Sequence, residues 1–181
     1  GGWAAGGARP ARRTLAASRG LGGRAGLLAG GWMRSYLPAH RGQAEAVLGA
    51  SGWFFANREE LLALGGDPEQ AEAFRTRWNL AGLAVKAGPR GCTVWSEAGA
   101  LHLPSLIEHG VVDVTGAGYA LAGGMLAAWV ESGGRPDGLR SALAHGIACA
   151  SLAISGVGLR GLAEATAEDL AARVGEALSQ L

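Results

Sequence analysis

One glycine-rich stretch constrains the chain more than any other feature of the sequence. It runs from Val111 to Gly124 and reads VVDVTGAGYALAGG. The backbone N–H groups of Gly116, Ala117 and Gly118 can point toward one position, and the apolar run after them predicts the start of a helix. Converging amides at a helix N-terminus bind anions, and phosphate is a natural ligand for them. The stretch therefore predicts a phosphate-binding turn.

The order Asp-x-Thr-Gly-Ala-Gly, with a Gly-Gly pair further on, resembles the signature of the PfkB (ribokinase-like) family of sugar and nucleoside kinases. The resemblance implies that the glycine turn is an anion hole, which stabilises charge on the phosphoryl group during its transfer from ATP. It also implies that Asp113 and Thr115 lie just before this hole, with a monovalent cation such as K⁺ near Asp113.

Tyr119 occupies the position at which the family has a catalytic carboxylate. In the family, that carboxylate takes the proton from the acceptor hydroxyl. A phenol has a reference pKa of about 10, so it is not a ready base at neutral pH. Losing a positioned base costs about 10²- to 10⁴-fold in rate, or roughly 3 to 5 kcal/mol of barrier. We therefore expect a chain of kinase descent with weak or absent activity. The alternative is a non-catalytic nucleotide-binding or interaction module.

The resemblance extends from about Ala46 to the C-terminus and includes an Asn-x-x-Glu element. The segment ASGWFFANREELLALGG, residues 50–66, is similar to a strand and helix of the family, with Asn57 and Glu60 at the matching positions. By resemblance this pair places Mg²⁺ and its waters near the ATP phosphates, and oxygen ligands suit that ion. A helix cap at Asn57 followed by a solvated Glu60 is the other interpretation.

A second glycine turn is similar to a family element beside the nucleotide. It lies in LAVKAGPRGCTVW, where Gly88 and Gly91 bound the turn. The resemblance makes Lys86 and Arg90 candidate phosphate neighbours. A plain hairpin turn needs the same glycines, so both interpretations stay open.

A third glycine cluster spells GxGxxG at positions 156, 158 and 161. A dinucleotide-binding site needs a strand before this motif and a helix directly after it. Here the preceding segment is predicted to be helical, and the next helix is expected to begin at Thr166. The family resemblance instead implies a loop near the adenine. The four histidines show no metal-ligand spacing.

The remaining pattern predicts an α/β layer structure, a sheet flanked by helices. The resemblance implies a partial ribokinase-like fold that lacks the N-terminal half, so that a second copy or a complementing partner covers the exposed sheet edge. Thr115 and Asp137 are predicted to cap helices that reach about Val130 and Ala153, and Thr166 with Asp169 resembles a capping box. The predicted strands are 52–56, 80–86, 92–96 and 101–103, and the other predicted helices are 43–48, 58–64 and 68–78.

Composition limits the classes of protein that remain. Hydrophobic residues make up 49% and charged residues 17%, without an apolar run of the roughly 18 residues that a membrane span requires. Cys92 and Cys149 fit no metal or disulfide pattern, and buried thiols agree with a cytoplasmic protein. We therefore expect ATP, Mg²⁺ and a sugar or nucleoside as partners, and neither a membrane nor a nucleic acid. The acceptor itself stays unidentified.

Charge divides the chain into two parts, although its net charge is only +1. Every charged residue before Glu45 is an arginine. We interpret residues 1–38 as a Gly/Ala/Arg-rich leader without regular structure, and 39–181 as a nucleotide-side kinase domain. A basic arm for an anionic surface and a misframed gene end are the alternatives for the leader.

Overall fold

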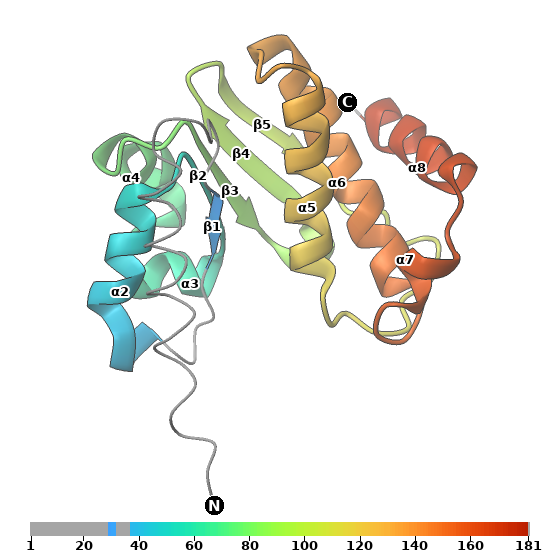
Figure 1. Ribbon diagram of the computed structural model, residues 1–181, viewed down its shortest axis with the longest axis horizontal. Helices are drawn as coiled ribbons and strands as arrows, with labels where there is room; N and C mark the ends of the chain where they lie inside the picture. Colours follow the sequence, from blue (N-terminus) through green and yellow to red (C-terminus); the bar gives the residue numbers. More distant parts are fainter. Residues whose placement is uncertain (1–28, 32–36, 181) are drawn as a thin grey trace, which may run out of the picture. The chain divides into compact units, whose positions relative to one another are not determined.

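The computed structural model describes residues 29–31 and 37–180, with side chains from Arg41 onward. The chain forms two compact units that meet in sequence between Val85 and Lys86. Figure 1 labels their elements and colours them along the chain. Among the described residues, no helix is both long enough and apolar enough to cross a membrane.

The first unit alternates strands with helices. Strand β1 (Ala29–Gly31) pairs in parallel with β2 (Trp53–Asn57), and β3 (Gly82–Lys86) is the next strand in the sheet order. The helices lie beside these strands in Figure 1, and they are α2 (Leu37–Ala50), α3 (Arg58–Ala63), the 3₁₀ turn η2 (Pro68–Gln70) and α4 (Ala71–Arg77). This alternation confirms the predicted α/β class.

The core of the first unit forms around β2. Its first four residues are all buried, which is typical of a strand covered on both faces. Trp53 and Phe54 are each 1% exposed, and Leu61 of α3 is fully buried beside them in the unit. Gly82 at the start of β3 lies against the Trp53 ring, because a Cβ there would overlap that ring.

The second unit packs helices with a β-hairpin. Strands β4 (Cys92–Ser96) and β5 (Gly99–Leu103) are antiparallel, with Cys92 opposite Leu103 and Ser96 opposite Gly99. Helices α5 and α6 pack lengthwise against each other, and α8 lies on α6 (Figure 1). The helical elements are α5 (Ala117–Glu131), α6 (Leu139–Ile154), α7 (Arg160–Glu164) and α8 (Ala167–Ser179), with the 3₁₀ turns η3 (Gly88–Arg90) and η4 (Pro136–Gly138).

Both cysteines belong to this unit and are free thiols. Cys92 is buried, and its removal from water raises the pKa of the thiol to about 12. Cys149 is only half-buried, and burial raises its pKa as well. The expectation of buried thiols is therefore confirmed for Cys92 and met in part for Cys149.

Two of the predicted helix caps are wrong. Helix α5 has Gly116 as its N-cap residue, and Thr115 precedes it without capping it. Helix α6 has Gly138 as its N-cap residue, while Asp137 lies in η4 and its carboxylate accepts a hydrogen bond from Arg135 Nε at 3.3 Å. In both cases the cap residue is the glycine directly after the predicted one. These helices begin without a side-chain cap.

The capping box of the last helix is confirmed. Thr166 Oγ1 accepts from the Asp169 amide at 3.1 Å, and Asp169 Oδ2 accepts from the Thr166 amide at 2.8 Å. One short helix was not expected, because α7 begins at Arg160 and Thr166 was predicted to start the next helix. Helix α2 is also longer than the predicted 43–48, since a proline in its first turn is tolerated.

The interpretation of residues 1–38 as a leader falls mostly outside the described residues. Within that range the structure places β1 and the first two residues of α2. Strand β1 pairs with β2 through Ala29 opposite Trp53 and Gly31 opposite Phe55. Residues 29–31 therefore belong to the fold of the first unit.

The adjacent glycines of α5 provide a matched test of the α5–α6 packing. A Cβ at Gly124 would lie 2.6 Å from Cys149 Sγ and 2.9 Å from His145 O, whereas a Cβ at Gly123 meets nothing within 4 Å. We expect Gly124→Ala to lower the free energy of unfolding by about 1 to 3 kcal/mol through overpacking. Gly123→Ala should be neutral or stabilise by up to about 1 kcal/mol. Denaturant unfolding measures both, and equal effects would contradict this packing.

Candidate functional site

The glycine turn at the start of α5 carries backbone donors without partners. Gly116 has φ +85°, in the left-handed region that favours glycine. The Ala117 amide donates to Val114 O at 3.3 Å, which is a long hydrogen bond. Within the described part of the chain, the amides of Gly116 and Gly118 have no acceptor. Two of the three predicted donors thus remain available to an anion.

Lys86, the sole lysine in the sequence, lies at this turn. A Cβ on Gly118 would be 3.0 Å from Lys86 Nζ, so the ammonium group lies against the first turn of α5. The N-terminus of a helix carries partial positive charge, so the ammonium group adds to the positive potential at this turn. Lys86, predicted as a phosphate neighbour, is thus brought together with the predicted anion hole. We call Gly116, Ala117, Gly118 and Lys86 the anion cradle.

Asp113 stabilises the loop before the cradle through hydrogen bonds to two backbone amides. Its Oδ1 accepts from the Thr115 amide at 2.9 Å, and its Oδ2 accepts from the Gly158 amide at 3.3 Å. The hydrogen bonds from Thr115 and then from Gly158 lower the pKa of the Asp113 carboxyl below its ordinary value. Each oxygen accepts a single N–H group and keeps a lone pair, so the monovalent-cation site expected near Asp113 stays a prediction.

Contacts from α6 and α8 hold the same loop along its length. The amides of Val112 and Asp113 both donate to Ile154 O, at 2.8 and 3.3 Å. Buried Ser151 donates through Oγ to Leu106 O at 2.8 Å, and Arg173 of α8 donates to the Ser151 hydroxyl. None of these contacts was predicted from the sequence, because the partners are distant along the chain and form no local motif.

His109 adds a further contact between the loop and α8. Its Nε2 lies 2.6 Å from Glu176 Oε2, in a partly exposed pair. The sequence pattern gave His109 no specific role, and spacing alone could not have paired residues so far apart.

Tyr119 is the third residue of α5 and lies on the surface. Its side chain is 75% exposed, and its hydroxyl makes no hydrogen bond with another described residue. Val114, just before the turn, and Val157, in the loop after α6, are also exposed, at 68% and 65%. The phenol is therefore accessible to a ligand or to solvent.

Asn57 and Glu60 lie in the first unit, where they form a capping box. Asn57 Oδ1 accepts from the Glu60 amide at 2.8 Å, and Glu60 Oε2 accepts from the Asn57 amide at 2.8 Å. Asn57 is therefore a helix cap, as one of the two interpretations held, whereas Glu60 is buried and not solvated. Among the described residues no group of three or more His, Cys, Asp and Glu side chains could hold a metal ion. The role of the pair in placing Mg²⁺ stays a prediction.

The Gly88–Gly91 turn is explained by its backbone. Gly91 has φ +93°, and a Cβ there would overlap the backbone of Leu103 and Pro104. The Ala87 amide donates to Gly91 O at 2.8 Å, and Ser105 Oγ donates to Gly88 O at 2.8 Å. Arg90 is exposed in η3. These contacts give the glycines a structural role, and the expected role of Arg90 as a phosphate neighbour stays a prediction.

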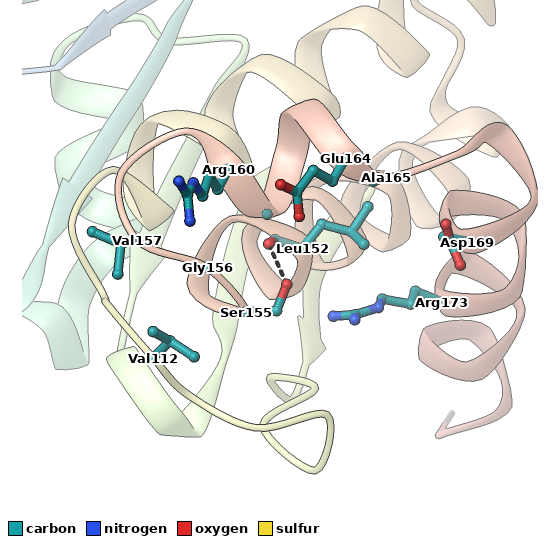
Figure 2. Close-up of a pocket in the computed structure, with 11 residues that line it drawn as sticks. Val112, Leu152, Ser155, Gly156, Val157, Arg160, Glu164, Ala165, Asp169 and Arg173 are labelled. Carbon is teal, nitrogen blue, oxygen red and sulfur yellow. Dashed lines mark hydrogen bonds between the residues drawn. The ribbon is translucent and has the colours of Figure 1, made fainter.

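Gly156 and Gly161 of the GxGxxG cluster line a pocket of about 480 Å³ in the second unit. The motif follows helix α6, so it lacks the strand that a dinucleotide fold places before it. Gly156 and Gly161 lie so close that a Cβ on Gly156 would be 2.6 Å from the Gly161 amide nitrogen. Figure 2 shows Arg173 reaching from α8 toward Ser155, whose Oγ donates to Leu152 O. Packing at this bend explains the two glycines.

The role of Asp113 gives a pH-dependent prediction. A carboxyl whose pKa is lowered in the folded state stabilises the fold at pH values above its ordinary pKa of 3.8, and this contribution disappears as the pH falls below that value. We expect Asp113→Asn to lower the melting temperature by a few degrees at about pH 6, and the difference from the parent chain to shrink below pH 3.8. Thermal melts across this range measure it. A difference that is constant with pH would contradict the assignment.

Solved structures of kinases share this fold. Aminoimidazole riboside kinase from Salmonella enterica superposes with a TM-score of 0.78 at 21% identity, over 92% of this chain and 58% of that one. Fructokinase from Vibrio cholerae O395 gives 0.77 at 18% identity, over 90% and 55%. A nucleoside kinase of the ribokinase family from Methanocaldococcus jannaschii gives 0.72 at 19% identity, over 92% and 53%.

At these identities the likeness shows the fold, which matches the predicted ribokinase-like architecture. The chain spans little more than half the length of these structures. Comparison with curated protein sequences found no match. The model of the pfkB family of carbohydrate kinases matches residues 30–166. The chain therefore belongs to the pfkB carbohydrate kinase family.

Proposed function

We propose that this chain binds the phosphates of ATP or ADP at the anion cradle and descends from an enzyme that phosphorylated a sugar or nucleoside hydroxyl. The observation that carries the proposal is the meeting of two uncommitted amides with the Lys86 ammonium at the start of α5. The solved structures named above include complexes with ADP and with an ATP analogue, which agrees with a nucleotide ligand.

The residues of the cradle fit a phosphoryl group that gains negative charge. The amides of Gly116 and Gly118 would donate to its oxygens, and Lys86 would neutralise part of its charge. Charge-assisted hydrogen bonds of this kind are roughly twice as strong as neutral ones. The nucleotide supplies the phosphoryl group, and the protein supplies donors that are already oriented by the turn.

Proton removal from an external acceptor is the step that this chain performs poorly. Tyr119 stands at the third position of α5, and a neutral phenol does not take a proton from an alcohol at neutral pH. We therefore propose that phosphorylation of a sugar or nucleoside is impaired. Asn57 and Glu60 cap α3, and their placement of Mg²⁺ near the nucleotide remains an expectation from the family resemblance.

A nucleotide-binding module without turnover is the second candidate. Exposure of Tyr119 at 75%, with no carboxylate bonded to it among the described side chains, favours this alternative. The two candidates separate when binding and turnover are measured together. A nucleotide that raises the melting temperature while no acceptor is phosphorylated supports the module.

Lys86→Met tests the cradle. We expect the affinity for ATP and ADP to fall by roughly tenfold or more, because a hydrogen bond to a charged group contributes about 1.5 to 3 kcal/mol. Arg140→Met is the matched control, since Arg140 is an exposed cation of the same unit at the start of α6. Titration calorimetry measures both. Equal affinities in the Lys86 variant and the parent would rule out the cradle.

Tyr119→Asp tests the missing base. The variant is joined to the part of Vibrio cholerae fructokinase that this chain does not cover, and is assayed with ATP and fructose against the same fusion carrying Tyr119. We expect turnover to rise by about 10²- to 10⁴-fold, the usual contribution of a positioned base. No gain in a fusion that binds ATP would count against the proposed role of position 119.

A further inference from the structure

We propose that the pocket between α6, α7 and α8 binds a free α-amino acid with a large apolar side chain. The pocket has a volume of about 480 Å³ and lies in the second unit. Sites for small molecules usually have volumes of about 300 to 1,000 Å³, so the pocket is large enough for such a ligand. None of the cradle residues lines it, and this inference does not rest on the proposed nucleotide binding.

Charged side chains line the pocket from two helices. Arg160 and Glu164 belong to α7, and Asp169 and Arg173 belong to α8 (Figure 2). Within the described part of the chain, the side chains of Arg160 and Glu164 make no hydrogen bond and no ion pair. One guanidinium and one carboxylate can therefore bind a ligand without first giving up a partner there.

Arg173 supplies a second cation, and a buried serine holds its guanidinium in place. Arg173 donates to the hydroxyl of Ser151, which is 2% exposed and itself donates to Leu106 O at 2.8 Å. A guanidinium has several N–H donors, so this contact leaves others for a ligand. Because the side chain is already positioned, a carboxylate that binds to it costs little further rotamer entropy.

The two signs of charge in the pocket select a ligand that carries both. Asp169 is engaged in the capping box of α8, where its Oδ2 accepts from the Thr166 amide at 2.8 Å and from the Thr166 hydroxyl at 2.7 Å. A ligand with several phosphates would be repelled by Glu164 and Asp169, and a simple cation would be repelled by the arginines. An α-amino acid carries a carboxylate for the arginines and an ammonium group for Glu164.

Apolar side chains in the lining favour an amino acid whose own side chain is apolar. Leu152 of α6 is buried, whereas Val112 and Val157 are exposed at 61% and 65%. An apolar group of the ligand that covers these two valines removes their methyl groups from water, which favours binding in proportion to the area covered. A polar amino-acid side chain would gain nothing from this contact.

Titration calorimetry of the full chain with L-phenylalanine tests the proposal, with L-leucine as a second probe. We expect saturable binding of one molecule per chain. Two analogues are matched controls, because 3-phenylpropanoate lacks the ammonium group and 2-phenylethylamine lacks the carboxylate. Each should bind roughly tenfold or more weakly than L-phenylalanine, since each loses a hydrogen bond to a charged group. Failure of both amino acids to bind, or equal affinities for L-phenylalanine and its analogues, would overturn the proposal.

Glu164→Gln locates the ammonium group of the ligand. We expect its affinity for L-phenylalanine to fall by roughly tenfold, with no change for 3-phenylpropanoate, which has no ammonium group to lose. Glu168→Gln is the matched control, because Glu168 is exposed on the first turn of α8 and does not line the pocket. It should leave both affinities unchanged. The same loss in both variants, or none in Glu164→Gln, would refute the assignment of Glu164.

Competition with ADP separates this pocket from the cradle. Saturating ADP should leave the affinity for L-phenylalanine within about twofold, because the two sites share no lining residue. Displacement of L-phenylalanine by ADP would assign the pocket to the nucleotide and overturn the proposal. A chain that binds L-phenylalanine but not ADP would support the amino-acid site while ruling out the proposed nucleotide binding.

Discussion

Two positive charges of different origin lie close together at the start of α5, in the second unit. One is the partial charge of the helix N-terminus, and the other is the ammonium of Lys86. Gly116 in its left-handed conformation keeps two amides uncommitted at the same place. The proposed binding of an anion rests on this juxtaposition of amides and ammonium.

Membership of the pfkB family bears on phosphate binding, whereas the identity of Tyr119 bears on catalysis. In the proposed function, backbone donors and Lys86 would bind phosphate whatever residue stands at position 119. Removal of a proton from an acceptor depends on that one side chain. A phenol therefore separates binding from turnover toward external acceptors.

Local chemistry predicted the parts of the structure that depend on neighbouring residues. We could predict the turn at Gly116 and the Thr166–Asp169 capping box from the sequence, because their contacts join residues that are close along the chain. Thr115 failed as a cap because a glycine with φ +85° takes the cap position, and cap preference does not encode that choice. The contacts from α6 and α8 to the loop before the turn could not be predicted, since only the folded chain brings them together.

Residues synthesised late determine the shape of the phosphate turn. The loop from Leu106 to Asp113 is held by Ser151 and Ile154 of α6 and, through His109, by Glu176 of α8. On the ribosome, the glycine turn emerges well before its supports, and chains begin to fold from the N-terminal side as they emerge. The loop before the turn can therefore gain these anchors only after α6 and α8 have left the exit tunnel.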